Sequence, residues 1–183
     1  MARQPNIPPG YFKLRNRLPT QHYAAIGRII TRWAIIEYKL AHLAFIALDM
    51  TQEAGRLTLR SQRAQERALL IQDLLRLKKV SAGINWRELS KTLKEMGSFR
   101  DRLAHSVWVK HPGSDDPVLQ DLSTAYIHDL PAGHRAKIEP IAVGIPLKNL
   151  NILSRNMDGL IKALTDMEGM MRHALGSSSE KSE

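Results

Sequence analysis

The chain has 183 residues, of which 43% are hydrophobic and 25% are charged, so it is long enough for one domain with a real core. It contains no Cys, which excludes disulfides, thiolate catalysis and cysteine-based zinc sites and fits a reducing cytoplasm, where we expect the protein to act. Its 27 Lys and Arg residues outnumber the 18 Asp and Glu residues, and the net charge of +9 favours an anionic partner such as nucleic acid, although a basic surface without a binding role fits the same composition.

The first 20 residues are expected to form an extended arm, because prolines and a glycine interrupt regular structure there. These residues are Pro5, Pro8, Pro9, Gly10 and Pro19. No apolar segment typical of a signal peptide is visible in this arm. The longest apolar stretch, within residues 26–50, is broken by charged side chains, so we expect neither a membrane span nor a membrane partner.

Residues 21–49 are predicted to form a long helix, because apolar residues recur at alternating intervals of three and four. These residues are Ile26, Ile29, Trp33, Ile36, Leu40, Leu43, Ala47 and Met50. A second stripe beside this seam contains a single charged residue, Glu37. If Glu37 points inward, its carboxylate needs a cationic or hydrogen-bonding partner. A glutamate that reaches solvent from the edge of the core is the alternative.

A second helix is predicted over residues 52–79, with a stripe of arginines along its first half. The stripe comprises Arg56, Arg60, Arg63 and Arg67, at spacings of four, three and four that place them on one face. Such a stripe suits the phosphate backbone of RNA, which makes these residues candidate RNA-binding side chains. A solvated face, paired with Glu53 and Glu66, is the alternative.

A third helix is predicted to begin near Asn85 and to end at His105. Its seam contains Trp86, Leu89, Leu93, Met96, Arg100 and Leu103, so Arg100 occupies a position where an apolar residue is expected. Val107-Trp108-Val109 then has the character of a short strand. Residues 118–145 combine strand-forming and turn residues, which indicates a small β-hairpin insertion.

The last helix is predicted over residues 147–175, entered through Pro146, and residues 176–183 are expected to form a disordered tail. Together these elements predict a mainly α fold. We expect a single helical domain over residues 21–175, a largely antiparallel four-helix bundle with the small β-hairpin insertion before its last helix.

The chemistry of the chain is concentrated in the sequence Arg100-Asp101-x-x-x-His105 on the third helix. Asp101 and His105 are four residues apart and share a helix face, so the carboxylate can orient the imidazole and fix its tautomer. Arg100 and His105 are separated by about 140° around a straight helix. A shared site therefore requires either a distortion near Gly97-Ser98 or His105, or a second copy of the chain that supplies the missing half.

This pattern resembles the HEPN superfamily (higher eukaryotes and prokaryotes nucleotide-binding domains), helical bundles with an Arg-x(4–6)-His motif. The family often has Asn or Asp directly after the arginine. The matching residues here are Arg100, Asp101 and His105, within Phe-Arg-Asp-Arg-Leu-Ala-His-Ser-Val-Trp. The segment Trp33-Ala-Ile-Ile-Glu37 is also similar to the Trp-x-x-x-Glu helix of some bacterial HEPN-like proteins.

The resemblance covers roughly residues 21–110 and the last helix, and residues 118–145 have no counterpart. It implies a homodimeric, metal-independent endoribonuclease, often a toxin or defence effector with a cognate antitoxin or regulatory protein. In such enzymes the 2′-hydroxyl of RNA attacks the adjacent phosphate and leaves a 2′,3′-cyclic end. The resemblance makes His105 the proton-transfer residue, Arg100 the phosphate-binding residue and Asp101 the orienting residue.

Two further expectations concern the surroundings of this motif. Because Glu37 and Arg100 each interrupt an apolar seam, periodicity predicts that Glu37 holds Arg100. Arg102 and Lys110 are expected to contact phosphates. We expect no metal and no cofactor, because the remaining histidines lack metal-ligand spacing and no glycine-rich phosphate loop is present.

Other functions remain compatible with the sequence. A non-catalytic HEPN-like module would bind RNA or a nucleotide through the same groups. A helical interaction module would instead pair its heptad seams with a partner protein. In the plainest alternative, Arg100 only neutralises Glu37 and His105 only caps a helix end.

Overall fold

A computed structural model describes residues 13–14, 18–81, 83–105, 107–110, 117–120 and 142–179. The chain forms two compact units. We call Met1–Gly27 with Asp101–Asn151 the sheet unit, and Arg28–Arg100 with Ile152–Glu183 the helical unit. The boundary between the units falls within three helices. The single domain behind an arm stays a prediction. Periodicity shows that a helix is amphipathic but does not show which neighbours each part of its length contacts.

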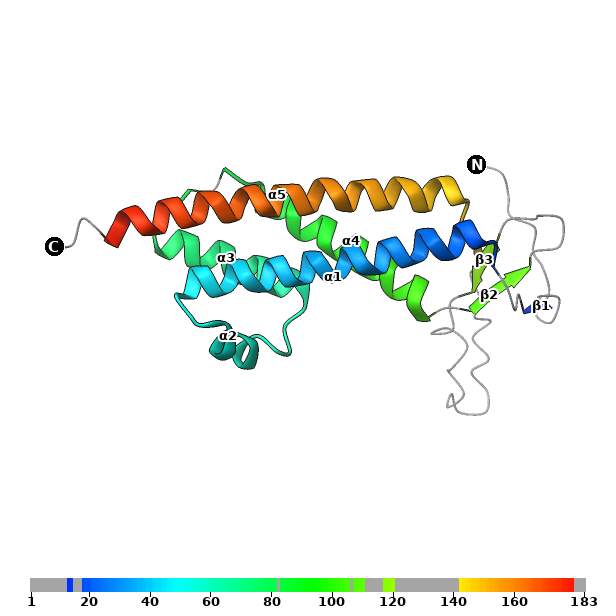
Figure 1. Cartoon of the computed structure of the whole chain (residues 1–183), viewed down its shortest axis with the longest axis horizontal. Helices are drawn as coiled ribbons and strands as arrows, with labels where there is room; N and C mark the ends of the chain where they lie inside the picture. Colours follow the sequence, from blue (N-terminus) through cyan, green and yellow to red (C-terminus); the bar gives the residue numbers. More distant parts are fainter. Residues whose placement is uncertain are drawn as a thin grey trace, which may run out of the picture. The chain divides into compact units, whose positions relative to one another are not determined.

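Helices make up most of the described residues, so the predicted mainly helical class is confirmed (Figure 1). They are α1 (Thr20–Leu48), α2 (Gln52–Thr58), α3 (Ala64–Leu77), α4 (Trp86–His105) and α5 (Leu147–Ser179). The last helix continues into the segment predicted as a tail. Glycine and serine lower helix propensity there, but no proline removes a backbone donor, so a long helix can continue for another turn. Within the described residues, no helix combines the length and the apolar character that crossing a membrane requires.

The prediction of one continuous helix over residues 52–79 is wrong, because α2 and α3 are separate helices. Thr51 caps the start of α2, and its hydroxyl accepts a hydrogen bond from the Ala54 backbone. A second start follows at Arg63, whose backbone N–H donates to the carboxylate of Glu66 at 2.8 Å. Glu66 therefore serves as a helix cap, and the chain leaves the helical path between Thr58 and Ala64.

In the helical unit, α1 and α5 lie side by side and run in the same direction (Figure 1). Arg32 donates two hydrogen bonds to Asp158, which lower the pKa of that carboxyl. Further along both helices, His42 lies 3.4 Å from Glu168. From the first contact to the second, the residue number increases along α1 and also along α5, so the two helices are parallel. The sequence predicted antiparallel neighbours. The connection between α1 and α3 explains this difference. The segment that contains α2 returns along α1, so α3 runs in the same direction as α1 (Figure 1).

The predicted apolar seam of α1 is buried in the helical unit. Its central members are all less than 5% exposed, namely Ile29, Trp33, Ile36, Leu40, Leu43 and Ala47. Ile26 and Met50, the first and last residues of the predicted seam, are partly exposed. Other buried side chains of this unit are Ile71 from α3, Leu93 and Met96 from α4, and Met157, Leu164, Met167 and Met171 from α5. Burial of these large apolar side chains, at about 1.5–3 kcal/mol for each one, is the main source of stability in this unit.

Among its described residues, the sheet unit contains four antiparallel strands in the order β1-β2-β3-β4. They are β1 (Lys13–Leu14), β2 (Val107–Lys110), β3 (Pro117–Gln120) and β4 (Ala142–Gly144). The second strand coincides with the strand predicted after His105. Strand β1 belongs to the segment predicted as an extended N-terminal arm, and it pairs with β2. Most of the predicted insertion, residues 121–141, lies outside the described residues.

Glu168 on α5 has basic side chains around its carboxylate, of which Lys39 and His42 belong to α1. Its carboxylate lies 3.0 Å from Arg172, 3.4 Å from His42 and 3.8 Å from Lys39. Burial by itself raises the pKa of Glu168, but the hydrogen bond from Arg172 and the charges of His42, Arg172 and Lys39 outweigh it, and the pKa falls below its usual range.

The lowered pKa of Glu168 predicts a pH-dependent contribution to stability. A carboxyl whose pKa is lower in the folded than in the unfolded protein stabilises the fold above the unfolded value, about 4.3. That contribution is lost as the pH falls through the folded value. Glu168→Gln is therefore expected to reduce the free energy of unfolding at pH 7, by on the order of 1 kcal/mol. The difference from the wild type should disappear in acid.

Urea unfolding between about pH 7 and pH 2 measures this difference. Asp166→Asn is the matched control, since Asp166 is an exposed carboxylate on the same helix. A difference between Glu168→Gln and the wild type that stays constant across the whole pH range would contradict the electrostatic origin of the effect.

Candidate functional site on α1 and α4

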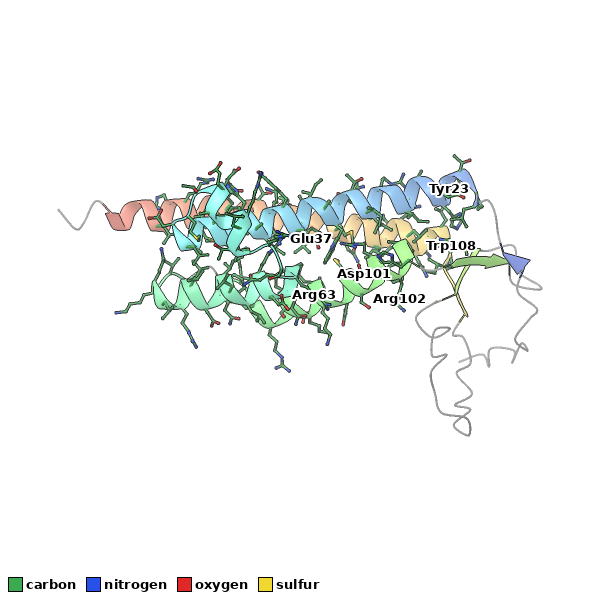
Figure 2. The ribbon with its side chains drawn as sticks, turned by 90° about the horizontal axis from the view of Figure 1, so that it is seen from below. Tyr23, Glu37, Arg63, Asp101, Arg102 and Trp108 are labelled. Carbon is green, nitrogen blue, oxygen red and sulfur yellow. The ribbon has the colours of Figure 1, made fainter. Side chains whose placement is uncertain are left out.

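The first component of the candidate site is a charge pair between α1 and α4. The Nη2 atom of Arg100 lies 3.5 Å from Oε1 of Glu37. The Arg100 side chain is 24% exposed and that of Glu37 is 38% exposed, so both are partly withdrawn from solvent. The contact predicted from the interrupted seams is therefore present. Figure 2 labels Glu37 on α1.

An aromatic ring provides the second contact to Arg100. The Arg100 guanidinium carbon lies 5.8 Å from the ring centroid of Trp33, which is within the range of a cation–π interaction. Trp33 precedes Glu37 by one turn of α1, so one helix face supplies both the carboxylate and the ring. The guanidinium is thus held from two directions.

Gly97 makes room for this ring. It lies one turn before Arg100 on α4, and a Cβ atom at this position would be only 3.0 Å from the Trp33 indole. Since α4 continues without interruption from Trp86 to His105, the helix is not broken at Gly97-Ser98. The absence of a side chain at Gly97 therefore serves close packing against Trp33 and not a bend.

Arg67 contacts the same part of α1 from another side. Its guanidinium donates to the backbone oxygen of Glu37 at 3.1 Å and to that of Leu59 at 3.2 Å. Arg67 therefore links α3 to α1 and to the turn after α2. Its position in the arginine stripe suggested a phosphate contact, and no sequence signal distinguished it from the other arginines. Glu37 is consequently engaged at its carboxylate by Arg100 and at its carbonyl by Arg67.

The other arginines of the stripe lie on separate elements. Arg56 is on α2, Arg60 is in the turn that follows, and Arg63 is the N-cap of α3. All three are exposed. The single basic face predicted for them is wrong, because it depended on one continuous helix.

The remaining motif residues belong to the sheet unit. Asp101, Arg102 and His105 lie in the last turns of α4 and are exposed (Figure 2 labels Asp101 and Arg102). Asp101 and His105 are one turn apart on a regular helix, which is the spacing that lets a carboxylate orient an imidazole. Lys110 ends β2, opposite Lys13 of β1.

The predicted motif supplies a guanidinium in the helical unit and a carboxylate and an imidazole in the sheet unit. A guanidinium binds phosphate oxygens in a planar fork, and an imidazole transfers protons near neutral pH. In the parts of the chain that the structure describes, no three His, Asp or Glu side chains gather as metal ligands would. No protein-family model, no curated protein and no solved structure matches this chain.

The Glu37–Arg100 contact predicts a measurable coupling energy. In a double-mutant cycle of Glu37→Gln and Arg100→Gln, the two changes should be non-additive by about 0.2–1 kcal/mol in low salt. The coupling should shrink in concentrated salt, because both side chains are partly exposed. Urea unfolding of the four proteins measures it.

Asp73 and Arg76 on α3 provide the control cycle. Their side chains are 64% and 80% exposed and 3.7 Å apart, so their coupling should be close to zero. A Glu37–Arg100 coupling no larger than that of this control pair would show that the site does not depend on the charge pair.

Proposed function

We propose that this protein is a metal-independent endoribonuclease of the HEPN type that cleaves RNA as a homodimer. The proposal includes a HEPN-like four-helix arrangement with a small β-hairpin insertion, and a cytoplasmic role as a toxin or defence effector. The observation that carries it is the pair of Arg100 with Glu37 and Trp33, followed on the same helix by exposed Asp101 and His105. The net charge of +9 favours RNA as the partner.

The proposed reaction is a transesterification within RNA. The 2′-oxygen attacks the adjacent phosphorus, the bond to the 5′-oxygen breaks, and a 2′,3′-cyclic phosphate forms. His105 of one copy accepts the proton of the 2′-hydroxyl, and His105 of the second copy donates a proton to the departing 5′-oxygen. Asp101 accepts a hydrogen bond from the imidazole and fixes its tautomer.

Arg100 would stabilise the negative charge that develops on the phosphate oxygens. Contact with Glu37 and Trp33 restricts its side chain before RNA binds, so less conformational entropy is lost on binding. This preorganisation supports a role for Arg100 at the reacting phosphate in preference to a general electrostatic one.

Other basic residues would hold the RNA on either side of the cleaved bond. Arg102, Lys110, Arg56, Arg60 and Arg63 remain proposed phosphate contacts. Arg67 is not among them, because its guanidinium donates to two backbone carbonyls. We assign it instead to positioning Glu37. A toxin of this type would require a cognate antitoxin or regulatory protein as a partner.

RNA cleavage in the presence of EDTA tests the proposal. Wild-type protein should cleave RNA and leave 2′,3′-cyclic phosphate ends. His105→Ala should slow cleavage by about 10²–10⁴-fold, since it removes the proton-transfer group. Arg100→Ala should slow it by about 10²–10³-fold, since it removes the charge stabilisation. Matched controls are His173→Ala on α5 and Arg76→Ala on α3, which should retain full activity.

Three outcomes would overturn the proposed activity. These are intact RNA after incubation with wild-type protein, cleavage that EDTA abolishes, and cleavage that survives His105→Ala. RNA binding without cleavage would assign the chain to the alternative class, a non-catalytic RNA- or nucleotide-binding module. If the chain neither binds RNA nor dimerises, a helical protein-interaction module is the remaining interpretation.

A further inference from the structure

A second group of basic and aromatic side chains lies in the helical unit, on α1 and α5. It comprises Tyr38, Lys39 and His42 from α1 and Glu168 and Arg172 from α5, and we call it the Tyr38 cluster. None of these residues is among the candidate site residues predicted from the sequence. Arg172 donates to Glu168 through Nε and Nη2, at 3.2 and 3.0 Å.

The ring of His42 lies beside both charged groups that α5 contributes to this cluster. Its Nδ1 atom lies 3.4 Å from the Glu168 carboxylate, and its Nε2 atom lies 3.4 Å from Nη2 of Arg172. A carboxylate accepts a hydrogen bond and a guanidinium only donates one. His42 therefore lies within reach of both side chains and connects α1 to them.

The Tyr38 cluster then has an excess of positive charge. Lys39 and Arg172 each carry one positive charge, and Glu168 carries the single negative charge among these residues. The Arg172 side chain is 56% exposed even while it binds Glu168. A guanidinium has five N–H donors in a planar fork, so an exposed arginine can bind a carboxylate and a phosphate together.

Tyr38 adds an exposed aromatic surface to this charge. Its ring stacks on that of His42, with centroids 6.1 Å apart and an interplanar angle of 18°. Tyr38 is nevertheless 58% exposed. A ring that is supported on one side and exposed to solvent is a stacking platform for an unpaired base.

We propose that the Tyr38 cluster binds one nucleotide of single-stranded RNA, with the base stacked on Tyr38 and the phosphate bound by Arg172 and Lys39. The choice of RNA as ligand rests on the proposed function. Single-stranded RNA is favoured over a duplex because bases within a duplex already stack on each other. It is favoured over an acidic peptide because a peptide would use the cations and leave the exposed ring unoccupied.

RNA binding by His105→Ala protein tests this inference, because that change blocks the proposed cleavage and leaves the full chain otherwise unaltered. The probes are a short unstructured RNA oligonucleotide and a duplex of the same length, each labelled for fluorescence anisotropy. Adding Tyr38→Ala should weaken single-strand binding by about 5- to 150-fold, the effect of losing one stacked base. Duplex binding should change by less than about twofold, because a duplex offers no unpaired base to stack.

Two companion variants separate stacking from other effects. Tyr38→Phe should retain single-strand affinity, since the ring remains. Tyr23→Ala is the matched control, because Tyr23 is also on α1 and is 53% exposed but lies outside the Tyr38 cluster. It should leave single-strand affinity unchanged.

The phosphate contact has its own test. Arg172→Gln should weaken single-strand binding and reduce the slope of log Kd against log salt concentration by about 0.7, the value for one phosphate contact on a single strand. Arg155→Gln changes an exposed arginine on the same helix and should leave the slope unchanged.

The inference is overturned if Tyr38→Ala and Tyr23→Ala bind the single strand equally well. It is also overturned if Tyr38→Ala weakens single-strand and duplex binding alike, or if the protein binds no single-stranded RNA. Loss of binding in Arg172→Gln alone would indicate a purely electrostatic surface, such as one for an acidic peptide, and would also overturn it. Tyr38-dependent binding by a chain that never cleaves RNA would sustain the inference and reject only the nuclease proposal.

Discussion

The charge pair between Glu37 and Arg100 is the constraint on which the candidate site depends. Each residue occupies a position where its helix would otherwise present an apolar side chain, so each needs the other to offset its desolvation. Trp33 lies beside the guanidinium, and Arg67 binds the carbonyl of Glu37. These contacts join α1, α3 and α4 at one point, which holds Arg100 in a defined position.

Much of the helical architecture could be predicted because apolar periodicity is a local property. The seam of α1 and the limits of α1 and α4 follow from intervals of three and four, and so does the meeting of Glu37 with Arg100. The break between α2 and α3 could not be predicted in this way. Glu66 is compatible with an ion pair on a continuous helix, and its role as a cap becomes evident only when the chain turns at Arg63.

The direction of the helices and the use of Arg67 were also beyond prediction. Periodicity is the same for a helix and for its reverse, so the parallel pairing of α1 with α5 depends on the path of the connections. An arginine on a helix face can equally bind solvent, phosphate or backbone. Arg67 binds backbone because the turn after α2 brings the Leu59 carbonyl close to its guanidinium. The candidate site was thus predictable where a charge interrupts a seam and unpredictable where a loop supplies the partner.

The free energy of desolvating Glu37 and Arg100 is also relevant to function. An ion pair taken partly out of water is often no more stabilising than apolar side chains of similar volume. Leucine at both positions would continue the apolar seams of α1 and α4 without the desolvation of two charges. The pair is therefore poorly explained by stability alone. The Tyr38 cluster has the same character, since a single carboxylate there orients cations that remain partly exposed. In both places a carboxylate contacts an arginine that stays partly exposed, and an aromatic ring belongs to the same group of side chains. A guanidinium in such a position can still bind an anionic ligand.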